Sequence, residues 1–117
     1  MINDSILSDI KSMLNISEED LSFDKDILSL INTDSLILNQ LGYGPDEPLV
    51  INKETTWESF GEPEWSTELA KTHIYQKVRL NFDPPNNSTL LENIKDLIAE
   101  YEYRILLYTE AKGEVNE

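Results

Sequence analysis

Hydrophobic and polar residues alternate along the chain with the period of an α-helix in four segments. In the first segment, residues 4–14, the apolar side chains fall within about 120° of one face when residues are placed 100° apart. Asn3 or Asp4 can cap this helix, and Asn15 followed by an acidic spacer can end it. The residues of the apolar face are Ile6, Leu7, Ile10, Met13 and Leu14.

A second, longer helix is predicted over residues 22–41. Ser22 or Asp24 can open it, and Gly42 can close it because glycine adopts the left-handed conformation found at many helix ends. Asp34 falls near the middle of the apolar arc, where a buried carboxylate requires a partner. The candidate partners, from the next helix, are Arg79, Lys77 and His73, and the residues of the apolar arc are Ile27, Leu28, Leu30, Ile31, Ile37, Leu38 and Leu41.

Residues 42–65 interrupt the helical pattern with three of the four glycines and three of the five prolines. A connection longer than about 12–15 residues is uncommon inside a compact domain and is often functional, so we interpret this segment as a working loop. Residues 49–51 are suited to a short strand that could add to a partner, and residues 56–60 to a single helical turn.

Two more helices are predicted, over residues 66–82 and from residue 88 or 89 to about residue 111. Ser66 can cap the first of them, and the prolines that follow Asp83 end it because proline cannot continue a helix. Thr89 and Glu92 have the spacing of a capping box at the start of the last helix.

These elements predict an all-α fold, a small bundle of about four helices with a long irregular loop between the second and the third. A chain of 117 residues with 39% hydrophobic content is expected to fold as one domain. We assign that domain to residues 1–111 and expect residues 112–117 to form a flexible acidic tail.

The charge balance restricts the classes of partner. The chain carries 23 Asp and Glu against 9 Lys and Arg, a formal net charge of −14, which argues against a protein that holds nucleic acid phosphates or an anionic membrane. The N-terminal segment is acidic, and no stretch approaches the roughly 18 apolar residues of a membrane span, so a soluble protein without a targeting segment is expected. The absence of cysteine excludes disulfides and thiol nucleophiles.

Motifs for catalysis or for a cofactor are missing. The chain has no phosphate-binding loop signature, and its single histidine, His73, cannot form a two-histidine metal site. We interpret His73 as a packed or interface residue and the acidic pairs Glu62/Glu64 and Glu100/Glu102 as solvated surface. The sequence therefore predicts no enzyme, no metal site and no cofactor.

Candidate interface residues are the hydrophobic side chains that the predicted helix faces do not use. The aromatic residues of the loop either attach the loop to the helices or contact a partner directly. On the last helix, three apolar residues lie around the sides that its core stripe leaves free, which favours an interface. The candidate interface residues are Leu49, Val50, Ile51, Trp57, Phe60, Trp65, Tyr103, Leu106 and Leu107, and Asp34 and His73 are candidate buried polar residues.

Six short segments also follow one another in an ordered set. They are residues 11–16, 22–24, 37–44 (ILNQLGYG), 56–60 (TWESF), 71–80 and 82–85 (FDPP). In this order, and over about residues 6–107, they resemble the head-tail connector family of tailed bacteriophages and prophages, small adaptor proteins that complete the head beneath the portal. The combination of ILNQLG with FDPP is the most specific part of the resemblance.

The resemblance implies a structural subunit of the virion without catalytic residues. Its expected partners are the portal protein, the next head-completion or tail protein, and further copies of itself in a ring, dodecameric in the assembled particle, whose isolated subunits can be monomeric. DNA is expected to pass nearby without specific binding, and no membrane is involved. The implied location is the head-tail junction of the virion, and the bacterial host cytoplasm during assembly.

Two other functions stay open from the residues alone. A small protein with a net charge of −14 could be an acidic DNA mimic that inhibits a nucleic-acid-binding protein. An enzyme built around His73 among acidic residues is the third hypothesis, and it has the weakest motivation.

Overall fold

The computed structural model describes residues 5–115, which form four α-helices and two short 3₁₀-helices and contain no β-strand. The helices are α1 (Ile6–Met13), α2 (Asp24–Gln40), η1 (Trp57–Phe60), η2 (Glu64–Ser66), α3 (Thr67–Phe82) and α4 (Ser88–Val115). The predicted all-α fold is confirmed. The helical turn expected at residues 56–60 is present as η1, whereas no strand forms at residues 49–51.

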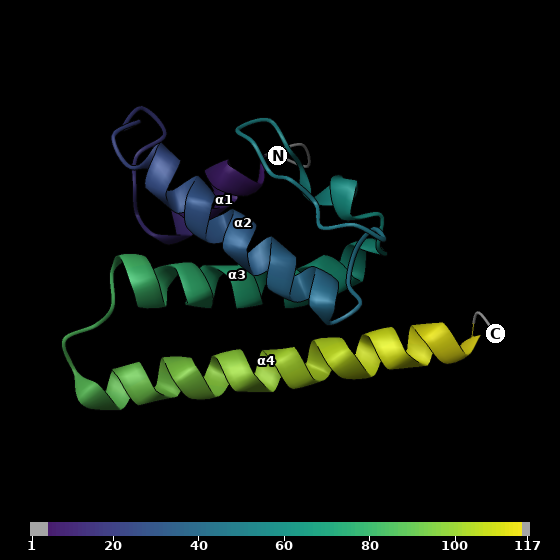
Figure 1. Cartoon of the computed structure of the whole chain (residues 1–117). Helices are drawn as coiled ribbons and strands as arrows, with labels where there is room; N and C mark the ends of the chain where they lie inside the picture. The colour runs from purple at the N-terminus through teal and green to yellow at the C-terminus, as the bar shows by residue number, and fades with distance from the viewer. Residues whose placement is uncertain (1–4, 116–117) are drawn as a thin grey trace.

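The helices are arranged in layers around α3 (Figure 1). On one side α3 packs against α2 and α1, and on the other side α4 runs along it. The 28 residues of α4 extend over about 42 Å and the 16 residues of α3 over about 24 Å, so α4 is much longer than its support. None of the helices in the described part of the chain has the length and hydropathy needed to cross a membrane.

The main core lies where α1, α2 and α3 meet, and the loop after α2 closes it. The helix faces expected from the hydrophobic period are buried, among them Ile27, Ile31 and Leu38 of α2. On α4 the stripe is only partly covered, because Leu90 and Leu97 remain 50% and 37% exposed. Further buried apolar residues are Ile6, Leu7, Ile10, Tyr43, Ile51, Phe60, Ala70, Ile74, Val78, Ile94, Ile98 and Ile105.

The cap of α1 is Ser5, whose hydroxyl accepts a hydrogen bond from the Ser8 backbone N–H at 3.0 Å. The predicted caps Asn3 and Asp4 lie outside the described residues. At the other end Asn15 adopts a φ of 61°, so the predicted exit of this helix is confirmed. Gly42 likewise follows the end of α2 with a positive φ of 90°.

The start of α4 differs from the prediction. Asn87 is the cap: its side-chain oxygen accepts hydrogen bonds from the backbone N–H groups of Thr89, at 2.8 Å, and Leu90, at 3.2 Å. The predicted capping box of Thr89 and Glu92 does not form, because the helix begins at Ser88, which places Thr89 inside it, and Asn87 accepts from the Thr89 N–H. The helix also continues to Val115, past the expected end near residue 111.

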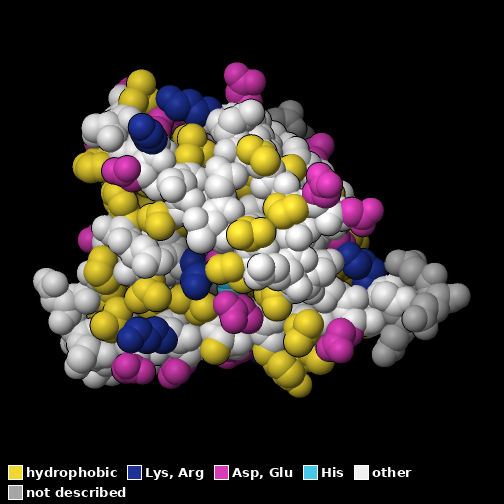
Figure 2. All heavy atoms as spheres, in the orientation of Figure 1, with side chains coloured by type: hydrophobic (Ala, Val, Ile, Leu, Met, Phe, Trp, Pro, Cys, Tyr) yellow, Lys and Arg dark blue, Asp and Glu magenta, His cyan; other side chains and the backbone are white. Residues whose placement is uncertain are grey.

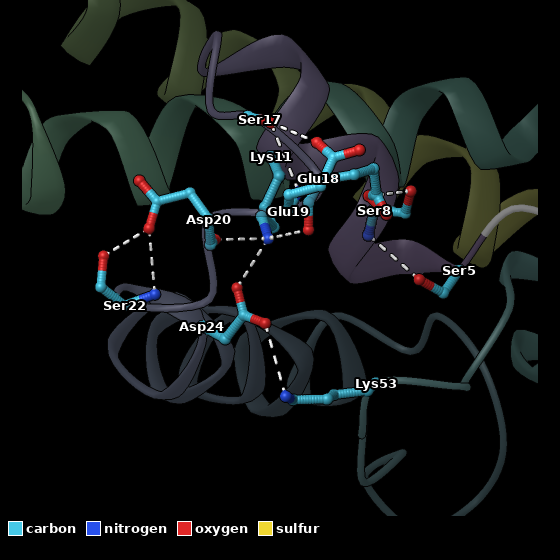
Figure 3. Close-up of polar contacts among 10 residues, drawn as sticks. All are labelled: Ser5, Ser8, Lys11, Ser17, Glu18, Glu19, Asp20, Ser22, Asp24 and Lys53. Carbon is cyan, nitrogen blue, oxygen red and sulfur yellow. Dashed lines mark hydrogen bonds and ion pairs between the residues drawn. The ribbon is translucent and has the colours of Figure 1, made fainter.

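A buried lysine joins α1 to the start of α2 (Figure 3). The Lys11 ammonium donates hydrogen bonds to the carbonyl oxygens of Glu18, at 3.3 Å, and Asp20, at 2.8 Å, and it forms an ion pair of 2.9 Å with Asp24. The exposed Lys53, from the loop, pairs with the other oxygen of Asp24 at 3.5 Å. Because Lys11 is only 2% exposed, these oxygens supply the partners that water would otherwise provide.

Candidate interface

A polar stripe on α2 holds the first part of the working loop. The side-chain oxygen of Asn32 accepts a hydrogen bond from the Ile51 N–H at 2.8 Å, and its amide nitrogen donates to the Ile51 carbonyl at 2.9 Å. The Ser35 hydroxyl donates to the Leu49 carbonyl at 2.7 Å. Residues 49–51 are therefore bonded to helix side chains, which explains why they form no strand and leaves less of their backbone free for strand addition.

The same stripe continues to Asn39, whose amide nitrogen donates to the carbonyls of Pro45, at 3.0 Å, and Asp46, at 3.2 Å. Asn32, Ser35 and Asn39 are spaced by three and four residues, so they lie on one face of α2. Sequence reasoning missed this anchor, although a polar stripe beside the apolar arc is a signal that could have indicated it.

Glu62 holds the last part of the loop against α4. Its carboxylate accepts hydrogen bonds from the Gly44 N–H at 2.9 Å and the Tyr108 hydroxyl at 2.7 Å, and it forms an ion pair with Lys112. Burial opposes the charged form, but these partners outweigh burial and hold the pKa of Glu62 below its ordinary value. The prediction that Glu62 is solvated surface is wrong, since its side chain is only 5% exposed.

Two of the loop aromatics attach the loop to the helices. The Trp57 indole N–H donates to the Asp9 carboxylate at 2.7 Å, and the Lys71 ammonium lies 5.4 Å from the centre of the Trp57 ring. Phe60 is 2% exposed and packs on Tyr43 with ring centres 5.4 Å apart. For Trp57 and Phe60 these contacts favour attachment of the loop to the rest of the fold over direct contact with a partner.

Other candidate residues of the loop lie at the surface. Trp65 is 65% exposed and rests edge-on against Tyr108, with ring centres 5.1 Å apart. Val50 is 79% exposed, and Leu49 is half-buried against the core. Ile51, in contrast, is 3% exposed and belongs to the core.

On α4 the three candidate residues form an exposed apolar patch. Tyr103 is 62% exposed, Leu106 is 40% exposed and Leu107 is 48% exposed. We call these three residues the outer face of α4. Figure 2 shows hydrophobic side chains projecting along the lower edge of the molecule, where α4 runs in Figure 1, with Asp and Glu side chains beside them.

The two candidate buried polar residues meet each other. Nδ1 of His73 lies 2.6 Å from the Asp34 carboxylate, and Nε2 lies 2.8 Å from the Glu102 carboxylate, so one imidazole connects α2, α3 and α4. Of the three candidate partners for Asp34, the structure selects His73. Burial lowers the pKa of His73, but the hydrogen bonds and charges of Asp34 and Glu102 outweigh burial and raise the pKa above its ordinary value.

The contacts of His73 are those of a structural residue. Both ring nitrogens of His73 face carboxylates, so neither is free to accept a proton from a substrate. His73 is also completely buried. Within the described residues, no group of three or more His, Asp or Glu side chains is arranged to hold a metal ion.

A family model described as phage connector protein matches residues 6–112. The chain belongs to the phage connector family. The match covers nearly all of the described residues and confirms the resemblance to head-tail connectors, so the connector is a structural component of a phage particle. No curated protein and no solved structure matches it significantly.

The connector presents its candidate interface residues in two places. Val50 and Trp65 are exposed on the working loop, and the outer face of α4 is exposed on the long helix. Ile51 and Phe60 contribute to the core, and Trp57 is half-buried beneath Lys71. Side chains of α2 hydrogen-bond to the loop backbone, and Tyr108 of α4 hydrogen-bonds to Glu62 of the loop. The loop is therefore held on both sides and does not present a free strand.

Proposed function

We propose that the connector assembles as a ring beneath the portal of a tailed phage or prophage, extends the DNA channel, and docks the next head-completion or tail protein. The family match over residues 6–112 is the observation that carries the proposal. The geometry supports a role in assembly, because the subunit exposes apolar side chains in two separate places. These are the loop with Val50 and Trp65, and the outer face of α4.

Anchoring of the loop supports a docking role. A binding surface that is already ordered loses less conformational entropy when a partner binds. Asn32, Ser35 and Asn39 hold the loop on α2, and Glu62 holds it on α4. The exposed Trp65 is therefore presented on a fixed backbone, and tryptophan is enriched among the residues that dominate binding energy.

The charge of the subunit suits a conduit for DNA. A duplex carries one phosphate per roughly 1.7 Å of its axis, so a ring of subunits that each carry a net charge of −14 repels it. Repulsion from all sides keeps the duplex from binding to the wall while it passes.

The proposal is tested by mixing the purified connector with the portal encoded by the same phage or prophage, followed by electron microscopy and native mass spectrometry. Ring-shaped complexes with the portal are the expected result. A connector that stays monomeric at high concentration and does not bind the portal would contradict it.

A matched pair of variants distinguishes the effect of losing an apolar residue of the loop surface from the effect of losing an exposed apolar residue elsewhere. Trp65→Ser should weaken ring formation or portal binding, since the indole is 65% exposed and lies on the working loop. Leu21→Ser removes a side chain that is 61% exposed in the connection between α1 and α2, outside the candidate interface, and should have little effect.

A further inference from the structure

We infer that the outer face of α4 docks on a separate protein that presents an apolar groove flanked by Lys and Arg side chains. The inference rests on the proposed function, because it gives the chemistry of the partner that a connector would contact through α4. Three observations carry it: the apolar patch, its acidic surroundings, and the net charge of the chain.

The residues of the apolar patch remain largely exposed in the isolated subunit. Tyr103, Leu106 and Leu107 are 62%, 40% and 48% exposed, whereas Ile98 and Ile105, on the opposite side of the same helix, are buried. Leu106 and Leu107 lie three and four residues after Tyr103, on the side of α4 that its core stripe does not use. A cluster of large apolar side chains on a helix surface marks a docking site more often than scattered single ones do.

Acidic side chains extend the same stripe at both ends. Asp96 lies seven residues before Tyr103, and Glu110 lies three residues after Leu107, so all four share one side of α4. Both acids are exposed, and no ion pair is found for either among the described residues. Glu100, between them, pairs with Arg104 at 2.9 Å.

This charge pattern identifies the kind of partner. A second copy that docked through the same face would bring Asp96 and Glu110 against the same acids of its neighbour, so like charges would meet. A groove flanked by Lys and Arg would pair with Asp96 and Glu110 while its apolar floor covers Tyr103 and Leu107. The docking should therefore weaken as salt screens the charges, whereas association between like-charged copies should strengthen.

The test uses the purified full-length connector against two probes in separate titrations, the purified cognate portal and the purified head-completion protein that follows the connector. The double variant Tyr103→Ser/Leu107→Ser should bind one of these probes at least about tenfold more weakly than the unmodified chain. Asp96→Lys/Glu110→Lys should also bind more weakly, and its affinity should depend less on salt.

The control is Glu19→Lys/Asp26→Lys, which changes the net charge by the same amount at exposed positions outside both the working loop and α4. This control should bind like the unmodified chain apart from a small change in association rate. Circular dichroism establishes that each variant keeps its helices.

The outcomes separate the inference from the proposed function. If the unmodified connector binds neither probe, the proposed function fails and the inference fails with it. If it binds and the α4 variants bind equally well, the inference is overturned while the proposed function stands. If those variants lose self-association but keep both probes, the outer face of α4 contacts another copy, and the inference is again overturned.

Discussion

Single residues decide how the helices of the connector are joined. His73 lies between the carboxylates of Asp34 and Glu102, and each of its ring nitrogens contacts one of them. One Asp34 oxygen is buried and has no hydrogen-bond partner among the described residues, so this carboxylate depends on the imidazole. A buried ion pair of this kind is costly to break, because the charge left behind has no solvent.

Replacing His73 with alanine should destabilise the connector by about 3–5 kcal/mol, since Asp34 would remain as an uncompensated charge in the core. Urea unfolding at neutral pH measures the change. Glu102→Gln is the matched control, and because the Glu102 side chain is 37% exposed, its loss should stay below about 1 kcal/mol. Equal losses in the two variants would contradict the assigned role of His73.

The same imidazole predicts a dependence of stability on pH. Asp34 and Glu102 raise the pKa of His73 above its ordinary value of 6.5, so the folded chain binds this proton more tightly than the unfolded chain. The stabilisation is therefore complete below pH 6.5 and is lost as the pH rises through the folded pKa. Urea unfolding of the unmodified chain and of His73→Gln should differ most below pH 6.5 and progressively less as the pH rises above it. A difference that does not change with pH would disprove the link.

At the scale of elements, the working loop is a bridge between α2 and α4. The contacts of Glu62 with Tyr108 and Lys112 connect residues 46 and 50 positions apart along the chain. The helix α4 extends well beyond the length of α3, so its C-terminal part relies on the loop for support. The loop and the C-terminal part of α4 should accordingly open together in local unfolding.

Glu62→Ala should release this bridge. The change removes the acceptor for Gly44, Tyr108 and Lys112 and should cost about 1–3 kcal/mol. Hydrogen exchange should become faster in residues 43–65 and 106–112 and less so in α1. Glu64→Ala, two residues away and exposed, is the control. Unchanged exchange in both variants would show that the bridge does not support α4.

At the scale of the whole molecule, shape and charge bear on assembly. The connector measures 45 × 34 × 23 Å, so it is elongated rather than spherical, and α4 runs along one edge of it (Figure 1). Its net charge of −14 opposes close contact between copies, although the apolar side chains of Val50 and Trp65 are exposed on the loop. Ring formation by the isolated connector is thus a balance between repulsion and apolar burial.

Added salt should shift this balance toward assembly. The screening length falls from about 10 Å at 0.1 M salt to about 3 Å at 1 M, which weakens the repulsion and leaves apolar burial in place. Sedimentation velocity over this range should show larger species as salt increases. A ring that dissociates in high salt would instead indicate that attractive ion pairs hold the copies together.

The sequence by itself determined the four helices, because the spacing of apolar residues sets which face of each helix is buried. It also determined that Asp34 lies in the core, that Asn15 and Gly42 end their helices, and, through ordered segments, the family. Each of these depends on residues that are near one another in the chain.

Only the tertiary structure decided which residues meet across the chain. His73 was one of three candidate partners, and Asp34 lies 39 positions away from it, a distance over which helical period carries no information. From its neighbours in sequence Glu62 is expected to be solvated, but the fold brings Lys112, 50 positions away, beside it. Residues 49–51 have the composition of a strand, but their backbone groups are hydrogen-bonded to Asn32 and Ser35 of α2 instead of to another strand. Such contacts are set by how folded helices pack, and local pattern does not contain that geometry.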